Sequence, residues 1–279
     1  MDSWRKNLEL LIKSRTPLIW IRTKEEERLY RILKQSCKRL NIKRFVSWDC
    51  VNGIKGILNE KGKFSNNPLG ALNWIKEQTS ELPTILLVKD FHKFYEDPSI
   101  NRTIKELSFS LRGTSNNLIL SSHILPSSEE LDDLITIINL PLPDLSELTN
   151  LIKKMAFNTD SDLSEQDLNE LAIASSGLTE TKLKQVTAKA LTQRGKISKD
   201  DIKDILEEKK QVIARSEILE FFESNSTQNE IGGLKVLKVW LKQRYRAFSK
   251  EAREYGLPIP KGVLLVGPQG TGKSLTAKS

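Results

Sequence analysis

Apolar runs alternate with amphipathic stretches along roughly the first half of the chain. Five runs predict strands, at Thr16–Thr23, Phe45–Asp49, Thr84–Lys89, Asn117–Ser122 and Leu134–Leu140. The stretches between them carry apolar residues at helical spacing, such as Leu29, Ile32 and Leu33. Strands separated by helices are connected by right-handed crossovers. We therefore expect a three-layer α/β domain around a parallel, doubly wound sheet.

Helices are predicted at residues 3–14, 71–79 and 101–112, and also directly after Thr23, where Thr23 and Glu26 have the spacing of a capping box. Residues 52–68 contain several Gly and Asn and a Pro, which predicts a loop. The pattern changes at Leu140-Pro-Leu-Pro-Asp144, after which helices are predicted at 145–155, 165–175 and 179–193. Ser176-Gly-Leu-Thr179 supplies a helix stop and a new cap.

These patterns divide the chain into four predicted parts. Residues 1–144 form an α/β core and 145–197 a helical lid. Residues 198–230 form a charged linker helix followed by a polar linker, and 231–279 begin a second α/β core. The apolar run Val263–Val266 predicts its first strand, buried on both faces.

A phosphate-binding loop follows that run directly. Its sequence fits the pattern G-x-x-x-x-G-K-[ST], which predicts an ATP site made by Gly267, Pro268, Gln269, Gly270, Thr271, Gly272, Lys273 and Ser274. Small residues let backbone N–H groups point at phosphate oxygens, and Lys273 can reach the β- and γ-phosphates. The Ser274 hydroxyl can ligate Mg²⁺ carried by the nucleotide. An accidental glycine-rich turn is the alternative.

The segment that leads into this loop resembles the AAA family of ring-forming ATPases. The resemblance rests on Ile231-Gly-Gly-Leu-Lys and on Tyr255-Gly-Leu-Pro-Ile-Pro-Lys-Gly before the loop. It implies ATP hydrolysis coupled to remodelling of a macromolecular partner, in a homo-oligomer. We identify no catalytic residue of the hydrolysis step within the 279 residues. We expect the chain to be a fragment or truncated product that hydrolyses ATP negligibly and binds it weakly at best, and a longer form to hydrolyse it.

The first predicted domain resembles an AAA module that cannot bind nucleotide. No glycine follows Thr23, and Glu25, Glu26 and Glu27 stand where phosphate would bind; we expect them to satisfy the helix N-terminus and to repel an anion. Lys89 stands where the Mg²⁺-ordering Asp belongs, and Asp90 takes the place of the water-polarising acid. A loop or pairing role for Asp90 is the plainer interpretation. The alternative function is accordingly a non-catalytic regulatory or partner-binding protein.

The whole pattern resembles a subfamily of AAA-domain proteins encoded in cyanobacteria and algal plastid genomes. The resemblance rests on a degenerate module before an intact one, the linker Glu207-Glu-Lys-Lys-Gln-Val-Ile, the segment Leu219-Glu-Phe, and Ile231-Gly-Gly-Leu-Lys followed by Trp240. The resemblance extends over nearly the whole chain and implies the chloroplast stroma, or alternatively the cyanobacterial cytoplasm. The unknown partner is expected to be a protein. From Ile231 onward there are ten Lys and Arg against two Glu, whereas the earlier residues carry 34 of each sign. This basic end favours anionic ligands, but basic and aromatic residues do not interleave, so nucleic acid is not the expected partner.

The remaining composition excludes several classes of protein. No run approaches ~18 apolar residues, so we expect no membrane span. Only two cysteines are present, Cys37 and Cys50, which favours a reducing compartment. The two histidines, His92 and His123, stand far apart in the sequence and have no Cys at ligand spacing. We therefore expect no metal site besides the Mg²⁺ of the nucleotide.

Overall fold

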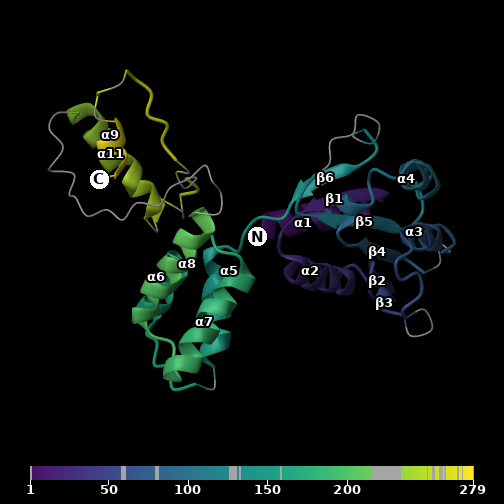
Figure 1. Ribbon diagram of the computed structural model, residues 1–279, viewed down its shortest axis with the longest axis horizontal. Coiled ribbons are helices and arrows are strands. Elements are labelled where there is room, and N and C mark those ends of the chain that lie inside the picture. Colours follow the sequence, from purple (N-terminus) through teal and green to yellow (C-terminus); the bar gives the residue numbers. More distant parts are fainter. Residues whose placement is uncertain are drawn as a thin grey trace. The chain divides into compact units, whose positions relative to one another are not determined.

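The computed structural model describes residues 2–57, 61–78, 82–125, 131, 133–157, 159–214, 234–249, 251–252, 255–257, 260, 262–268, 270–271 and 273–278. The chain forms two compact units, residues 1–209 and 210–279 (Figure 1). No described helix is long and apolar enough to cross a membrane.

The first unit is built on a six-stranded sheet. Its strands are β1 (Leu18–Arg22), β2 (Arg44–Asp49), β3 (Gly53–Lys55), β4 (Thr84–Val88), β5 (Asn117–Ser122) and β6 (Thr136–Asn139), in the order β3-β2-β4-β5-β1-β6. The five predicted strands are all present and all pair in parallel, which confirms the predicted fold class. β1 lies between β5 and β6, and its neighbours come from the far end of the domain: Leu18 lies opposite Leu118, and Ile19 opposite Thr136.

The prediction that residues 52–68 form only a loop is wrong. Residues 53–55 form β3, which pairs antiparallel with β2 at the sheet edge. The tight return from β2 depends on Gly53, whose φ is 62° and where a Cβ atom would lie 2.3 Å from the Lys63 carbonyl oxygen. Only glycine adopts this conformation at this spacing without strain.

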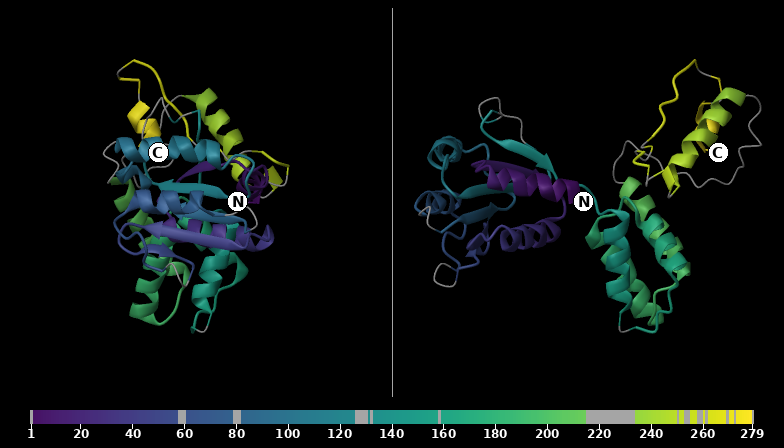
Figure 2. Two further views of the ribbon diagram at one scale, coloured as in Figure 1. Left: turned by 90° about the vertical axis from the view of Figure 1, so that its right-hand side faces the viewer. Right: turned by 180° about the vertical axis from the view of Figure 1, so that it is seen from behind.

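Helices cover both faces of the sheet (Figure 2). On one face α1 (Asp2–Lys13) and α2 (Glu26–Arg39) contribute Leu8, Leu29 and Leu33 to a core with Ile19 and Ile85. On the other face the covering helices are α3 (Pro68–Lys76) and α4 (Pro98–Ser110), with Leu72, Ile104, Trp20, Trp48 and Leu120 among the buried residues. Each fully buried aliphatic side chain stabilises the fold by about 1.5–3 kcal/mol.

A separate core unites the helices that follow, α5 (Leu145–Ala156), α6 (Glu165–Ser175), α7 (Glu180–Arg194) and the start of α8 (Ile202–Ala214). We call these four helices the lid helices. Their starts follow local capping chemistry. Asp144 and Ser164 each form a capping box, and the predicted cap at Thr179 is confirmed, since its hydroxyl accepts a hydrogen bond from the Lys182 amide. Gly195 ends α7 in the left-handed conformation.

The second unit contains α9 (Lys235–Tyr245) and α11 (Lys273–Lys278). The prediction of a buried strand at Val263–Val266 is wrong for this structure. These residues belong to no strand, and Val263, Leu264 and Val266 are at least half exposed. A central parallel strand needs hydrogen-bonding partners on both sides, and the described residues of this unit provide no neighbouring strand.

Candidate functional site

The first candidate site lies at the carboxyl edge of the sheet, where β1 leads into α2. The Thr23 hydroxyl accepts a hydrogen bond from the Glu25 amide at 2.9 Å, and α2 begins only at Glu26. Glu25 takes the N-cap position but its side chain makes no capping bond. The predicted capping box of Thr23 and Glu26 is therefore wrong. This hydrogen bond closes a short turn from Thr23 to Glu25, so the helix begins at Glu26 and not directly after Thr23.

The Glu25 carboxylate does not cap α2. It is buried, with 4% of its surface exposed, and it accepts hydrogen bonds from Arg28 Nη1 and from the backbone amide of Glu180, both at 2.6 Å. Glu180 opens α7, so the carboxylate lies at the positive end of a lid helix. The expectation that the glutamates satisfy the N-terminus of α2 is thus wrong for Glu25. Its charge instead connects the sheet domain to the lid helices.

Further ion pairs strengthen this connection. Arg28 is buried and donates to the Glu147 carboxylate at 2.8 Å and to the Pro141 carbonyl oxygen at 2.7 Å. Arg31 pairs bidentately with Glu180. Arg31 and then Lys184 lower the pKa of Glu180 to about 2. In all, two arginines of α2 reach carboxylates of α5 and α7.

Another ion pair lies close by, between the end of β4 and the start of α2. Lys89 Nζ is 2.7 Å from Glu26 Oε1, and the lysine side chain is only 15% exposed. An intramolecular cation and anion therefore face each other at the point where the resemblance expects a Mg²⁺-ordering carboxylate and a phosphate. The Lys89 ammonium is thus paired and mostly buried, whereas the Glu26 side chain stays 45% exposed. That this unit does not bind ATP remains a prediction.

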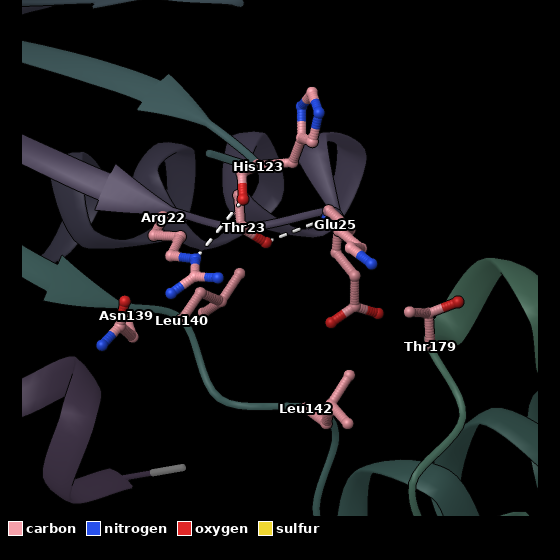
Figure 3. Close-up of a pocket in the computed structure, with 9 residues that line it drawn as sticks. Arg22, Thr23, Glu25, His123, Asn139, Leu140, Leu142 and Thr179 are labelled. Atoms are coloured by element: carbon pink, nitrogen blue, oxygen red, sulfur yellow. Dashed lines mark hydrogen bonds between the residues drawn. The ribbon is translucent and has the colours of Figure 1, made fainter. Parts of the chain in front are cut away.

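Two hollows open at this edge. One, of about 290 Å³, is lined by Arg22, Thr23, Lys24, Glu25, His123, Asn139, Leu140, Leu142 and Thr179 (Figure 3). Arg22 donates to the His123 carbonyl oxygen at 3.3 Å. Figure 3 shows the His123 ring turned away from the Glu25 carboxylate. A second hollow of about 230 Å³ has Thr23, Glu26, Asp90 and His123 among its walls.

The two histidines that are distant in the sequence are neighbours in the structure. The ring centroids of His92 and His123 are 4.6 Å apart, and the rings are nearly perpendicular. Burial lowers the pKa of His92, and His123 lowers it further. Asp90 completes the group, since ligand atoms of all three side chains lie within 4.8 Å of one another. The sequence spacing did not predict this group of metal-ligating side chains, and the expectation of no metal site besides the Mg²⁺ of the nucleotide stays a prediction. Parallel strands brought the two histidines to one edge, which their spacing could not reveal.

The second candidate site is the glycine-rich loop before α11. Lys273 Nζ folds back over the loop, donating to the Gly267 carbonyl oxygen at 2.6 Å and also to that of Pro268. The Thr271 hydroxyl donates to the Pro268 carbonyl oxygen at 2.9 Å, and Gly270 has a left-handed φ of 81°. These residues fit a phosphate group, because a lysine ammonium already lies inside a tight turn of small residues.

Several predicted site residues lie outside the described part of the chain. They include Gln269 and Gly272 of the loop, the Ile231-Gly-Gly segment and Lys261 of the lead-in. Ser274 lies in the first turn of α11 and is exposed, and its role as a Mg²⁺ ligand stays a prediction.

Comparison with family models gives two matches. The N-terminal domain of SpoVK-like AAA ATPases matches residues 4–140, and the second domain of the same ATPases matches residues 146–216. The solved structure of PCH-2 from C. elegans is similar in fold, with a TM-score of 0.52 at 12% identity, over 76% of this chain and 69% of that one.

Curated relatives extend the similarity over nearly the whole chain. The AAA domain-containing protein ycf46 of Guillardia theta is 41% identical over 99% of this chain, and that of Pyropia yezoensis is 38% identical over the same share. The chain spans only 55% and 56% of the length of these two relatives. A proteasome-activating nucleotidase of Sulfurisphaera tokodaii is 36% identical over 40% of this chain and 28% of its own length.

Proposed function

Since this chain belongs to the SpoVK-like AAA ATPases, we propose that its second unit binds ATP·Mg²⁺ while its first unit acts as a closed module without nucleotide. In this proposal Lys273 holds the β- and γ-phosphates, backbone amides of Gly267–Ser274 surround them, and Ser274 ligates Mg²⁺. ATP would supply the bond between its β- and γ-phosphates, whose hydrolysis transfers the γ-phosphoryl group to water.

The position of the Lys273 ammonium carries this proposal. Its hydrogen bonds to the loop carbonyl oxygens of Gly267 and Pro268 hold the charge inside the turn before any ligand arrives. A phosphate entering the loop would exchange these two neutral acceptors for charged oxygens. The lysine donor is charged in both states, so the exchange adds the attraction between a cation and an anion, which favours binding.

For the longer protein represented by the relatives, we propose ATP-driven remodelling of a protein partner by a homo-oligomer. The ycf46 relatives are plastid-encoded, which supports the chloroplast stroma as the location. The cyanobacterial cytoplasm is the alternative.

The second candidate function is a non-catalytic regulatory or partner-binding protein. Two contacts in the first unit favour it. The Lys89–Glu26 pair links the end of β4 to α2, and the buried Glu25 links the start of α2 to α7, where a nucleotide would otherwise bridge the elements. A module closed by its own charges can present a constant surface to a partner at any nucleotide concentration.

Nucleotide titration of the 279-residue chain tests the first candidate. We expect saturable binding of ATP·Mg²⁺ that Lys273→Ala reduces at least about tenfold, because one phosphate-facing ammonium is worth more than 1.4 kcal/mol. Lys242→Ala, which removes an exposed lysine of α9, is the matched control and should bind like the parent chain. Equal affinity in the parent and Lys273→Ala would refute the assignment.

Phosphate release then distinguishes the two candidates. In a form extended to the length of the relatives, turnover that Lys273→Ala abolishes supports the ATPase. Saturable binding without turnover in that form supports the non-catalytic function.

A further inference from the structure

Asp90, His92 and His123 form a compact group at the carboxyl edge of the sheet in the first unit. Asp90 follows β4, His92 lies in the short helix η2 (Phe91–Lys93), and His123 follows β5. β4 and β5 are parallel neighbours, so the residues that follow them meet at one edge. Among the residues that the structure describes, these three are the metal-ligating side chains that cluster in this way, with their ligand atoms all within 4.8 Å of one another.

The two ring nitrogens of His92 define the chemistry of the group. Both are buried and have no hydrogen-bond partner within the protein. A buried polar atom without a partner costs about 1–3 kcal/mol, so such an arrangement in a native structure calls for an explanation. His123, its neighbour at 4.6 Å, is a side chain that can share a ligand with it.

The backbone around His92 is held in place while its two companions can adjust. Phe91 is fully buried and packs edge-on against Trp20 with centroids 5.4 Å apart, which fixes η2 on the sheet. Asp90 has a left-handed φ of 49°, a conformation that Asp tolerates better than most residues. Backbone outliers of this kind cluster at functional sites. Asp90 and His123 are exposed, so their side chains can rotate toward a ligand.

Two imidazoles and one carboxylate are a recurrent ligand set for divalent first-row metals, with Zn–N and Zn–O bonds of about 2.0–2.2 Å. Tetrahedral bonds of that length place ligand atoms about 3.3–3.6 Å apart. The present separations of up to 4.8 Å therefore need to close by about 1–1.5 Å, which side-chain rotation of Asp90 and His123 can supply. Asp90 and His123 also line the hollow of about 230 Å³, which leaves space for a water or other ligand in a fourth position.

From this geometry we propose that Asp90, His92 and His123 bind a divalent transition-metal ion, with Zn²⁺ as the reference ion. The site differs from the expected Mg²⁺ of the nucleotide in its ligands, its unit and its preferred metal. It lies within the degenerate module, and it would tie the ends of β4 and β5 together where a nucleotide is not expected to bind.

The test is a Zn²⁺ titration of the tag-free 279-residue chain in the absence of nucleotide, so its result is independent of the ATP proposal. A Cys50→Ser background removes the exposed thiol as a competing ligand. We expect one Zn²⁺ per chain, and a loss of affinity of at least about 100-fold in His123→Asn and in His92→Ala, since even residues that only support a metal ligand cost 10–100-fold. Asp90→Asn should also weaken binding.

Controls separate ligand loss from unfolding. Glu96→Gln removes an exposed carboxylate a few residues further along and should leave Zn²⁺ affinity unchanged. His123 is exposed, so His123→Asn should keep the parent circular dichroism even if His92→Ala does not fold. Co²⁺ bound in place of Zn²⁺ should give the visible absorption of a nitrogen- and oxygen-ligated ion in the parent and lose it in His123→Asn. Parent and His123→Asn chains with the same Zn²⁺ affinity would overturn the proposal.

Discussion

The ammonium of Lys89, just after β4, lies 2.7 Å from the carboxylate of Glu26 in the first turn of α2. This pair joins the two elements between which an ATP-binding module would hold metal and phosphate. Each charge satisfies the other, so an incoming triphosphate would have to break the pair and also face the acidic residues around it.

We therefore expect the first unit not to bind ATP·Mg²⁺. Calorimetric titration of the parent chain at millimolar nucleotide should therefore fit a single saturable site, and Lys273→Ala should weaken that site. Near-ultraviolet circular dichroism of the variant should match that of the parent, so that the change in heat reports on the site and not on unfolding. A second saturable site whose affinity Lys273→Ala leaves unchanged would mean that the charges around Glu26 do accommodate phosphate.

Arg28 should be the most costly charged residue of the first unit to remove. Its guanidinium is 3% exposed and pairs with Glu25, which is 4% exposed, and with Glu147. Arg28→Ala leaves the Glu25 carboxylate buried without that partner, and breaking a buried pair costs about 3–5 kcal/mol. Urea denaturation should show this loss in the free energy of unfolding. Arg39→Ala, at a position 57% exposed, is the control and should cost under about 1 kcal/mol.

Glu180 should make the stability of the first unit depend on pH in the acid range. Its hydrogen bond to Arg31, and then Lys184, lower the pKa of this carboxyl from 4.5 to about 2 in the folded state. The ionised form therefore stabilises the fold above pH 4.5, and this contribution is lost as the pH falls toward 2. Arg31 is half exposed, so water screens the pair and the contribution at pH 7 is about 1 kcal/mol.

The measurement compares unfolding free energies of the parent and Glu180→Gln at pH 7 and pH 3. The variant should be less stable at pH 7, and the difference should shrink at pH 3. The exposed Glu77→Gln provides the control for loss of one carboxylate. A difference that grows on acidification would contradict the assigned sign.

The two cysteines should differ sharply in reactivity. Burial raises the pKa of the Cys37 thiol to about 12, whereas Cys50 is exposed. Because the thiolate is the reactive species, a thiol reagent at pH 8 should modify one cysteine per native chain and two in denaturant. Cys50→Ser should abolish the fast reaction. Rapid modification of both thiols in the native chain would show that α2 does not protect Cys37.

The sequence predicted the structure best where the apolar pattern of a segment matches the burial of that segment in the folded domain. The continuous apolar run Ile85–Val88 predicted β4, because a strand buried on both faces carries few polar residues. The other four parallel strands include polar residues, as in the half-exposed β6, and were recognised from shorter apolar runs between helical stretches. β3 escaped prediction because its three residues carry little pattern and depend on the turn at Gly53. Val263–Val266 has the pattern of a strand, but pattern cannot supply the neighbouring strands that a sheet requires.

The candidate sites divide in the same way. The phosphate loop is contiguous, so its residue types could be recognised directly from Gly267 to Ser274. The loss of glycine after Thr23 was equally visible. The partners of Glu25 and His92 could not be predicted. Glu25 meets an amide of α7, and His92 meets His123, only after the chain has folded. Contacts between distant residues leave no spacing rule in a single sequence.

The place of β1 between β5 and β6 has a consequence for synthesis on the ribosome. Leu18 pairs with Leu118, and Arg22 with Asn139, so the first strand to emerge must wait for more than half of its domain before either neighbour exists. Until then neither edge of β1 has the strand that will pair with it, although α1 and α2 can already cover Ile19 and Ile21 on one face. Long-range parallel pairing of this kind slows folding and prolongs the exposure of unpaired strand edges and apolar surface. The growing chain is thus most vulnerable to aggregation, and most in need of chaperones, before β6 has left the exit tunnel.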